Sequence, residues 1–236
     1  MGADLEARWN IGPVEIPGRL ALAPMAGVSV QAFRRQGRRY GAGLVCSEMV
    51  SCAGLQHGNE RTLGYLRIGR DEHPLAVQIF GSEPGTMAEA ARMVEDAGAD
   101  LVDINFGCPV RKVTKTGAGA TLLEEPDRAC RIVESVARAV SLPVSVKMRR
   151  GLENGSRAAL SVGPKLIEAG AASLTLHPRS ARQIAGVLQR LDWVRLQAST
   201  FAMLACEKRP RVFKRNLSVC ANPYEHGGRM SHDTRI

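Results

Sequence analysis

Short apolar runs alternate with longer amphipathic stretches between about residues 19 and 177. The runs are rich in Val, Ile and Leu, and glycine, proline or polar clusters bound them. Apolar side chains on both faces are typical of parallel strands that are covered on both sides. The pattern predicts six strands, at Arg19–Ala23, Gly43–Cys46, Leu75–Phe80, Leu101–Asn105, Val144–Lys147 and Ser173–His177.

Four amphipathic stretches between these runs predict helices. Ser29–Tyr40 begins on a residue type that commonly caps helices. Pro84–Ala97 and Pro126–Val140 each carry proline in the first turn, where its missing N–H costs nothing. Arg157–Ala169 ends before Gly170, and Ala97 likewise precedes a glycine, as expected at a helix C-terminus. Strands and helices therefore alternate along the chain.

Repeated strand–helix units predict either a TIM barrel or an open doubly wound sheet. Nearly every predicted strand ends in a chemically capable residue, and a barrel would gather these ends on one face. We therefore predict a TIM-barrel fold. It is incomplete, because six strands are visible where a barrel has about eight. The rhythm stops after Gln183, which predicts a partial barrel domain over residues 1–183 and a divergent tail over 184–236 with one weak helix at Val187–Ala205.

Composition narrows the class of protein. No apolar run approaches the roughly 18 residues that span a membrane, and the polar N-terminus does not resemble a signal peptide, so we expect a cytoplasmic protein. None of the six cysteines forms a C-x-x-C pair, which predicts no metal site. The net charge is +9, and the tail holds nine Lys/Arg against four Asp/Glu. This charge fits an RNA partner, and a solvated tail equally well.

The segment Asn105–Pro109 follows a buried strand and contains Cys108. A thiol above a barrel strand would face a bound ligand and serve as nucleophile or general acid. Taken alone, the segment is as well explained by a buried structural cysteine. The basic stretch 110–120, with Arg111, Lys112 and Lys115, predicts a flexible loop that closes over an anionic substrate or follows an RNA backbone, or else a solvated surface loop.

Three further polar residues end predicted strands. Lys147 is placed to neutralise charge that develops on a reduced cofactor. Gln78 is able to hydrogen-bond the edge of a heterocycle. His177 is, by itself, more often a satisfied core histidine than a catalytic residue. Their repeated placement at strand ends is a stronger signal than any one of them.

The ordered motifs resemble one protein family. They read LALAPMAGVS, LVCSEMVS, LAVQIFGSEP, GADLVDINFGCPVRKVTKTGAGATLL, LPVSVKMRRG and LTLHPRS. Over roughly residues 13–183 the chain closely resembles the tRNA-dihydrouridine synthases, especially the bacterial type. The cysteine loop followed by K-x-G-A-G-A is the most specific of these motifs.

The resemblance implies an FMN-bearing TIM barrel that reduces a uridine in tRNA, with NADPH or NADH as the reductant of the flavin. It implies that Cys108 is the catalytic acid and that seven other residues contact the flavin. These are Pro24, Met25, Ala26, Gln78, Asn105, Lys147 and His177. Arg111, Lys112 and Lys115 become expected tRNA contacts.

The resemblance stops near Gln183. The family continues with two further strand–helix units that hold the FMN phosphate and with a helical RNA-binding domain, and neither is visible in residues 184–236. We therefore expect a gene that is truncated or frameshifted after about residue 183, with weak FMN binding and little tRNA reduction. The alternatives are an inactive fragment with weak RNA affinity and a related flavin barrel that acts on a free pyrimidine.

Overall fold

Six parallel strands form the centre of the molecule and follow one another in space in sequence order. The computed structural model describes residues 5–184 and 202–204. The strands are β3 (Ala21–Leu22), β4 (Leu44–Ser51), β5 (Leu75–Phe80), β6 (Leu101–Phe106), β7 (Val144–Arg149) and β8 (Ser173–His177). All six predicted strands are confirmed, and the consecutive parallel order is that of an incomplete TIM-barrel wall.

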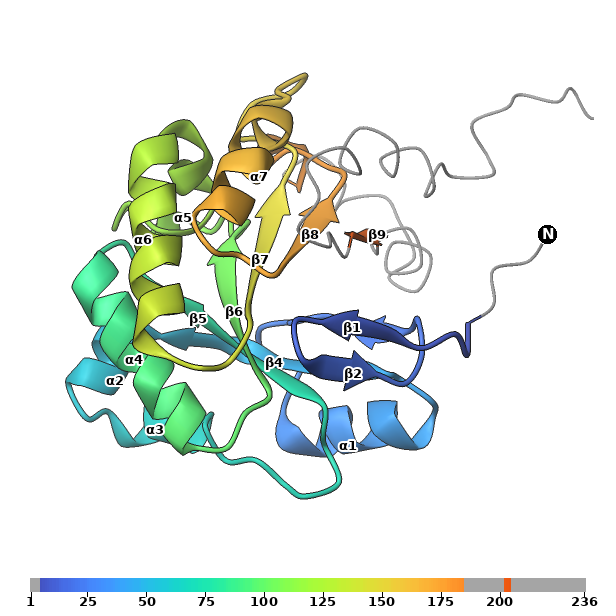
Figure 1. Ribbon diagram of the computed structural model, residues 1–236. Coiled ribbons are helices and arrows are strands. Elements are labelled where there is room, and N and C mark those ends of the chain that lie inside the picture. Colours follow the sequence, from blue (N-terminus) through green and yellow to red (C-terminus); the bar gives the residue numbers. More distant parts are fainter. Residues whose placement is uncertain (1–4, 185–201, 205–236) are drawn as a thin grey trace, which may run out of the picture.

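Helices connect successive strands and cover one face of the sheet (Figure 1). The four predicted helices are α1 (Gln31–Arg39), α4 (Pro84–Asp96), α6 (Pro126–Ala139) and α7 (Ala158–Glu168). Further short helices are α2 (Cys52–Gln56), α3 (Glu60–Gly64), α5 (Arg111–Thr114) and the 3-10 turns η1 (Gly119–Glu124) and η2 (Arg182–Ile184). The prediction of a flexible loop for the basic stretch 110–120 is therefore wrong, since this stretch contains α5 and the start of η1.

The two faces of the sheet differ in character. Val102, Ile104 and Phe106 of β6 join the large apolar core beneath the helices, on what we call the outer face. Asp103 and Asn105 alternate with them and are directed to the opposite, inner face. Both faces are buried, as predicted, but the expectation that both are apolar is wrong, because the inner face carries polar side chains.

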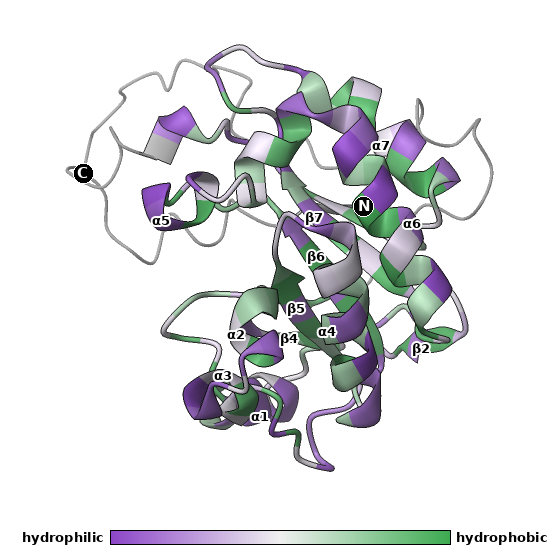
Figure 2. Cartoon of the chain, turned by 90° about the vertical axis from the view of Figure 1, so that its left-hand side faces the viewer, coloured by the Kyte–Doolittle hydropathy of each residue, from purple (hydrophilic) through white to green (hydrophobic). Residues whose placement is uncertain are grey.

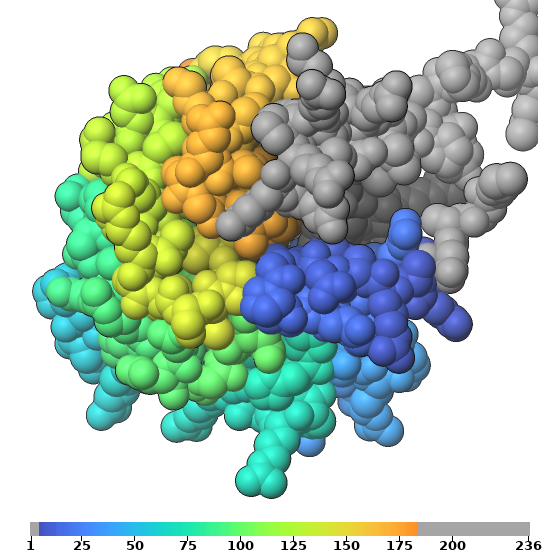
Figure 3. All heavy atoms as spheres, viewed as in Figure 1, coloured from blue at the N-terminus to red at the C-terminus, as the bar shows by residue number. Residues whose placement is uncertain are grey.

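A hairpin that the sequence analysis did not predict covers the lower part of the inner face. Its strands are β1 (Trp9–Ile11) and β2 (Val14–Ile16), which pair antiparallel. Ile11 and Ile16 are buried with Leu101 in a second, smaller apolar cluster. Figure 3 shows the hairpin beside the chain segment near residue 143, and Pro143 lies against Gly12. The hairpin thus fills the inner face with apolar side chains at the end opposite the C-terminal ends of the strands.

The sequence predicted that Ser29 caps helix α1, and this prediction is wrong. The helix begins at Gln31, and its N-cap residue, Val30, makes no side-chain cap. The Ser29 hydroxyl instead donates to the Ala23 carbonyl (2.9 Å) and accepts from the Met25 amide (2.9 Å). The serine therefore fixes the loop that follows β3.

A strand at Ala202–Leu204, β9, pairs antiparallel with β8. The helix predicted for Val187–Ala205 is therefore wrong at its C-terminal end, and its remainder lies outside the described residues. The tail proposed for 184–236 also lies almost wholly outside them. Within the described ranges, no helix is long and apolar enough to cross a membrane, and no three His, Cys, Asp or Glu residues gather as they would around a metal ion.

Candidate active site

Polar residues of the inner face lie in register across neighbouring strands. Gln78 of β5 is paired with Asp103 of β6, which is in turn paired with Ser145 of β7. Two residues further along, Asn105 is paired with Lys147. Because parallel strands keep this register, side chains that are distant in the sequence form rows near the C-terminal end of the sheet. We call this end, with the loops that follow the strands, the mouth.

A continuous chain of buried hydrogen bonds runs along these rows. Ser145 Oγ donates to Asp103 Oδ1 (2.6 Å), and Gln78 Nε2 donates to Asp103 Oδ2 (2.5 Å). Asn105 Nδ2 then donates to Gln78 Oε1 (2.8 Å). A carboxylate only accepts, so Asp103 determines which end of the Gln78 amide faces it. The orientation of Gln78 in turn sets that of Asn105.

Asn105 connects this hydrogen-bond chain to the loop that contains Cys108. Its Oδ1 accepts from the backbone N–H groups of Gly107 (3.0 Å) and Cys108 (2.8 Å). The Cys108 carbonyl accepts from the Ala120 amide (3.0 Å). Gly119 has a φ of +70°, and a Cβ there would lie 2.6 Å from the Cys108 carbonyl oxygen, so the close approach requires glycine. Both sides of the loop are therefore held.

A pocket at the mouth brings together most of the predicted site residues. Cys108, Gln78, Asn105 and Lys147 line it, as do Pro24 and Ala26. The other lining residues are Met49, Gly107, Pro109, Val110 and Arg149. No carboxylate lines this pocket, and two cationic side chains do. It therefore suits a partly anionic ligand.

Met25 and His177 do not line this pocket. Met25 belongs to the loop after β3, where its amide is bonded to Ser29. His177 lies in register beside Arg149. Burial, together with Arg149 and Lys147, lowers the pKa of His177 to about 3, so its imidazole is neutral at physiological pH. Its Nδ1 accepts from the Arg179 amide (3.1 Å), which leaves the proton on Nε2.

The predicted RNA-contacting residues are exposed beside the pocket. Arg111 and Lys112 lie on α5, immediately after the pocket residue Val110, and Lys115 is the C-cap residue of that helix. Figure 2, in which the ribbon is coloured by hydropathy, shows hydrophilic residues on α5 on one side of the strands and on α1 and α3 on the other. The three residues therefore flank the mouth without entering the pocket.

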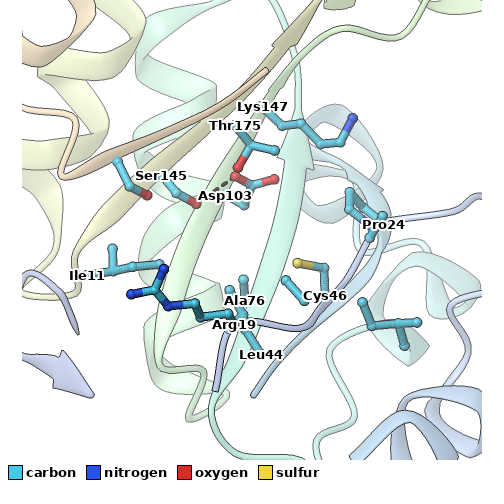
Figure 4. Close-up of a pocket in the computed structure, with 14 residues that line it drawn as sticks. Ile11, Arg19, Pro24, Leu44, Cys46, Ala76, Asp103, Ser145, Lys147 and Thr175 are labelled. Carbon is cyan, nitrogen blue, oxygen red and sulfur yellow. Dashed lines mark hydrogen bonds between the residues drawn. The ribbon is translucent and has the colours of Figure 1, made fainter. Parts of the chain in front are cut away.

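Burial and nearby charge act in opposite directions on Cys108. Burial raises the pKa of the thiol, whereas Arg149 and Lys147 lower it by a smaller amount. The thiol is consequently protonated at neutral pH, yet two cations are placed to stabilise its anion. Burial also lowers the pKa of Lys147, while Asp103 raises it. Figure 4 shows the Lys147 side chain extending away from Asp103, with its nitrogen at the far end.

Sequence reasoning missed Asp103, Ser145 and Arg149. Burial raises the pKa of Asp103 to about 6, although hydrogen bonds from Ser145 and Gln78 lower it. Arg149 Nε donates to the Gly107 carbonyl (2.8 Å) and so supports the cysteine loop from β7. The signal that would have found them is the alternation in VDINF and VSVKMR, which places Asp103, Ser145 and Arg149 on the same face as Asn105 and Lys147.

Glu48 is a further buried acid near the mouth. The register of β4 against β5 shifts between Cys46 and Met49, which marks a bulge. Glu48 lies within this bulge, and its carboxylate accepts a short hydrogen bond from the Gly27 amide. The bulge therefore turns a strand side chain toward the loop that supplies Pro24 and Ala26 to the pocket.

Comparison with known proteins decides the family. The family described as dihydrouridine synthase (Dus) matches residues 21–198. The chain belongs to the dihydrouridine synthase family. The match continues past the predicted boundary near residue 183, so family-like sequence extends further than the motifs alone indicated.

Curated members of this family cover most of the chain. The chain is 42% identical over 172 residues to tRNA-dihydrouridine synthase B of Pseudomonas aeruginosa. The aligned segment covers 72% of this chain and 52% of that protein. It is 39% identical over 200 residues to the probable tRNA-dihydrouridine synthase 1 of Synechocystis, covering 83% of this chain and 56% of that protein. The chain thus spans about half the length of the curated relatives it matches.

Two solved structures share the fold. A histamine dehydrogenase from Rhizobium superposes with a TM-score of 0.52 at 13% identity, over 67% of this chain and 34% of that one. Morphinone reductase in complex with tetrahydroNAD superposes with a TM-score of 0.50 at 16% identity, over 77% of both chains. At these identities the likeness concerns the fold alone, and it agrees with the partial barrel wall.

Proposed function

We propose that this protein reduces a uridine of tRNA to 5,6-dihydrouridine, with FMN as cofactor and NADPH or NADH as reductant, in the cytoplasm. The observation that carries the proposal is the Cys108 thiol. It stands at a pocket lined by Lys147 and Arg149, in a loop that a buried hydrogen-bond chain holds in place. Family membership supplies the substrate class and the dihydrouridine product.

The residues present fit a flavin. Lys147 Nζ makes no hydrogen bond or ion pair within the described residues, so this cation is available to an electron-rich ring edge. The Gln78 amide uses one N–H internally, toward Asp103, and retains a second, whereas Asn105 Nδ2 donates to both Gln78 Oε1 (2.8 Å) and the Met49 sulfur (3.7 Å). Pro24 and Ala26, from the loop after β3, line one wall of the pocket. When bound, reduced FMN supplies the hydride that adds to carbon 6 of the uracil ring.

Cys108 provides the proton in this scheme. Reduction of the carbon 5–carbon 6 double bond requires a hydride at carbon 6 and a proton at carbon 5. The raised pKa of Cys108 keeps the proton on Sγ until it is transferred. The S–H bond breaks as the carbon 5–hydrogen bond forms, and Arg149 and Lys147 stabilise the resulting thiolate. Water then returns a proton to the sulfur.

The RNA must present its uracil outside the base stack, because the pocket lies below the rim of the mouth. Arg111, Lys112 and Lys115 are placed at that rim, next to the pocket residue Val110. We assign them to the tRNA backbone, since contacts to phosphates position an RNA without reading its sequence. His177, neutral and beside Arg149, is assigned to hydrogen bonding from Nε2 toward the cofactor.

Two measurements separate the proposal from its alternatives. Purified chain titrated with FMN should show a perturbed flavin absorbance spectrum, whereas an inactive fragment should leave free FMN unchanged. In a bacterial strain that lacks its own dihydrouridine synthases, expression of the chain should restore dihydrouridine to tRNA. Reduction of free uracil with no restoration in tRNA would instead support the barrel that acts on a free pyrimidine.

A further inference from the structure

A second pocket lies beside the mouth, between α1, α3 and the segment that follows α3. Its lining includes Arg34, Arg61 and Arg67, together with Gln31, Tyr65 and Val30, and no acidic residue. Its volume is about 250 Å³. Pockets for drug-sized ligands run from about 300 Å³ upward, so this one suits a smaller group.

The carboxylates nearest the pocket are already engaged. Glu72 Oε2 accepts from Arg34 Nε (2.6 Å), while its Oε1 accepts from Gln31 Nε2 (2.8 Å) and the Gly69 amide (2.7 Å). Asp71 accepts from Arg35 Nε (2.6 Å). Glu60 of α3 is exposed and does not line the pocket. Two positive charges are therefore left without compensation.

These two charges are the guanidinium groups of Arg61 and Arg67. Both side chains are exposed and make no hydrogen bond or ion pair within the described residues. By contrast, Arg34 is buried and its donors are used by Glu72, the Ser29 carbonyl (2.9 Å) and the Arg67 carbonyl (3.2 Å). Arg34 thus forms a rigid floor that fixes the backbone of Arg67, while the Arg67 side chain stays available.

The same scaffold connects this pocket to the mouth. The Ser29 carbonyl accepts a hydrogen bond from Arg34. The Ser29 hydroxyl accepts one from the Met25 amide, in the loop whose Pro24 and Ala26 line the pocket of Cys108. Val30, the next residue, lines the second pocket and is 46% exposed. The two pockets are therefore lined by opposite ends of the loop 23–30, which joins β3 to α1.

We propose that the pocket of Arg61 and Arg67 binds a backbone phosphate of RNA that lies across the mouth. This proposal rests on the proposed function, because the uracil in the cysteine pocket belongs to that RNA. Guanidinium groups match the oxygens of a phosphodiester, and Tyr65 and Val30, which line the same pocket, offer an apolar surface to the adjoining ribose or base. Since Arg111 and Lys112 lie on α5 and Arg61 and Arg67 line the second pocket, cationic residues then lie on both sides of the mouth.

The first test measures the salt dependence of tRNA binding. Fluorescence anisotropy with an unmodified tRNA transcript is followed from low to moderate KCl for the 236-residue chain and for Arg61→Ala/Arg67→Ala. We expect affinity to fall about tenfold, and the slope of log affinity against log salt to shrink by about one. The charge-matched control is Arg92→Ala/Arg131→Ala, exposed residues on α4 and α6, with a change below about twofold. Equal effects in the two variants would overturn the proposal.

A second test uses the unaltered protein, so it does not depend on the fold of a variant. Phenylglyoxal modification of arginine is mapped by peptide mass spectrometry with and without the tRNA. Bound tRNA should protect Arg61 and Arg67 several-fold and leave Arg92 unprotected. Protection by polyglutamate at equal charge but not by tRNA would overturn the assignment in favour of an acidic protein partner, and absence of protection would overturn it outright.

Failure of this proposal is distinguishable from failure of the proposed function. If the natural chain forms dihydrouridine and the Arg61→Ala/Arg67→Ala variant binds tRNA as tightly as the natural chain, the phosphate site is disproved and the proposed function is retained. If tRNA binding depends on Arg61 and Arg67 but no dihydrouridine forms, the phosphate site is retained and the proposed function is disproved.

Discussion

The two faces of the sheet use consecutive residues of one strand for different purposes. In β6, Ile104 enters the apolar core under the helices, while its neighbours Asp103 and Asn105 join the hydrogen-bond chain of the inner face. Both faces are buried, yet one gains stability from area removed from water and the other from matched donors and acceptors. The stability of the outer face therefore depends on apolar volume, and that of the inner face on matched polarity.

The largest expected effect lies on the outer face. Ile104→Ala removes a fully buried side chain from a closely packed core and should lower the free energy of unfolding by about 2–5 kcal/mol. Urea unfolding at pH 7 measures it. Leu160→Ala on α7, where the side chain is 44% exposed, is the control and should cost far less. Equal losses would contradict the assignment of Ile104 to the core.

On the inner face, stability should depend on pH through Asp103. Its folded pKa of about 6 lies above the ordinary pKa of 3.8 for an aspartic acid, so its stabilising contribution is complete below about pH 4 and is lost as pH rises through 6. Relative to Asp103→Asn, the natural chain should therefore lose up to about 3 kcal/mol between pH 4 and 7. Paired urea titrations across that range measure the difference, and a difference that does not vary with pH would disprove the assignment.

A substitution at Asn105 removes the hydrogen bonds that connect the buried chain to the Cys108 loop. Asn105→Ala leaves the Gly107 and Cys108 amides without their acceptor, which should cost about 1–3 kcal/mol and loosen the loop. Peptide-resolved alkylation should then find Cys108 reacting faster, with buried Cys52 unchanged as an internal reference. Unaltered Cys108 reactivity would show that Asn105 does not hold the loop.

The smallest effect is spectroscopic. Because the pKa of His177 is lowered to about 3, its imidazole should show no protonation between pH 5 and 8. NMR of the histidine ring nitrogens, assigned by His177→Gln, measures this. A midpoint near 6.5 would mean that His177 is not buried beside Arg149 and Lys147 as described.

Much of the outer face could be predicted from sequence, and less of the inner one. Runs such as LAVQIF specify a strand through local apolar pattern, and Leu75–Phe80 is confirmed residue for residue. Ser29 matched a helix cap by type, yet its partners are set by the loop around it. The pairing of Gln78 with Asp103 depends on strand register, which no local pattern records. The β1–β2 hairpin escaped because three-residue strands carry almost no periodicity.

The central claim is that the polar mouth reduces uridine with Cys108 as proton donor. The most direct measurement is dihydrouridine formed in an unmodified tRNA by the chain with NADPH and excess FMN, so that modest cofactor affinity does not limit the reaction. Cys108→Ala should lower the rate at least about 100-fold with FMN binding unchanged, while Cys130→Ala should match the natural chain. Equal rates for Cys108→Ala and the natural chain, or no dihydrouridine from either, would contradict the account.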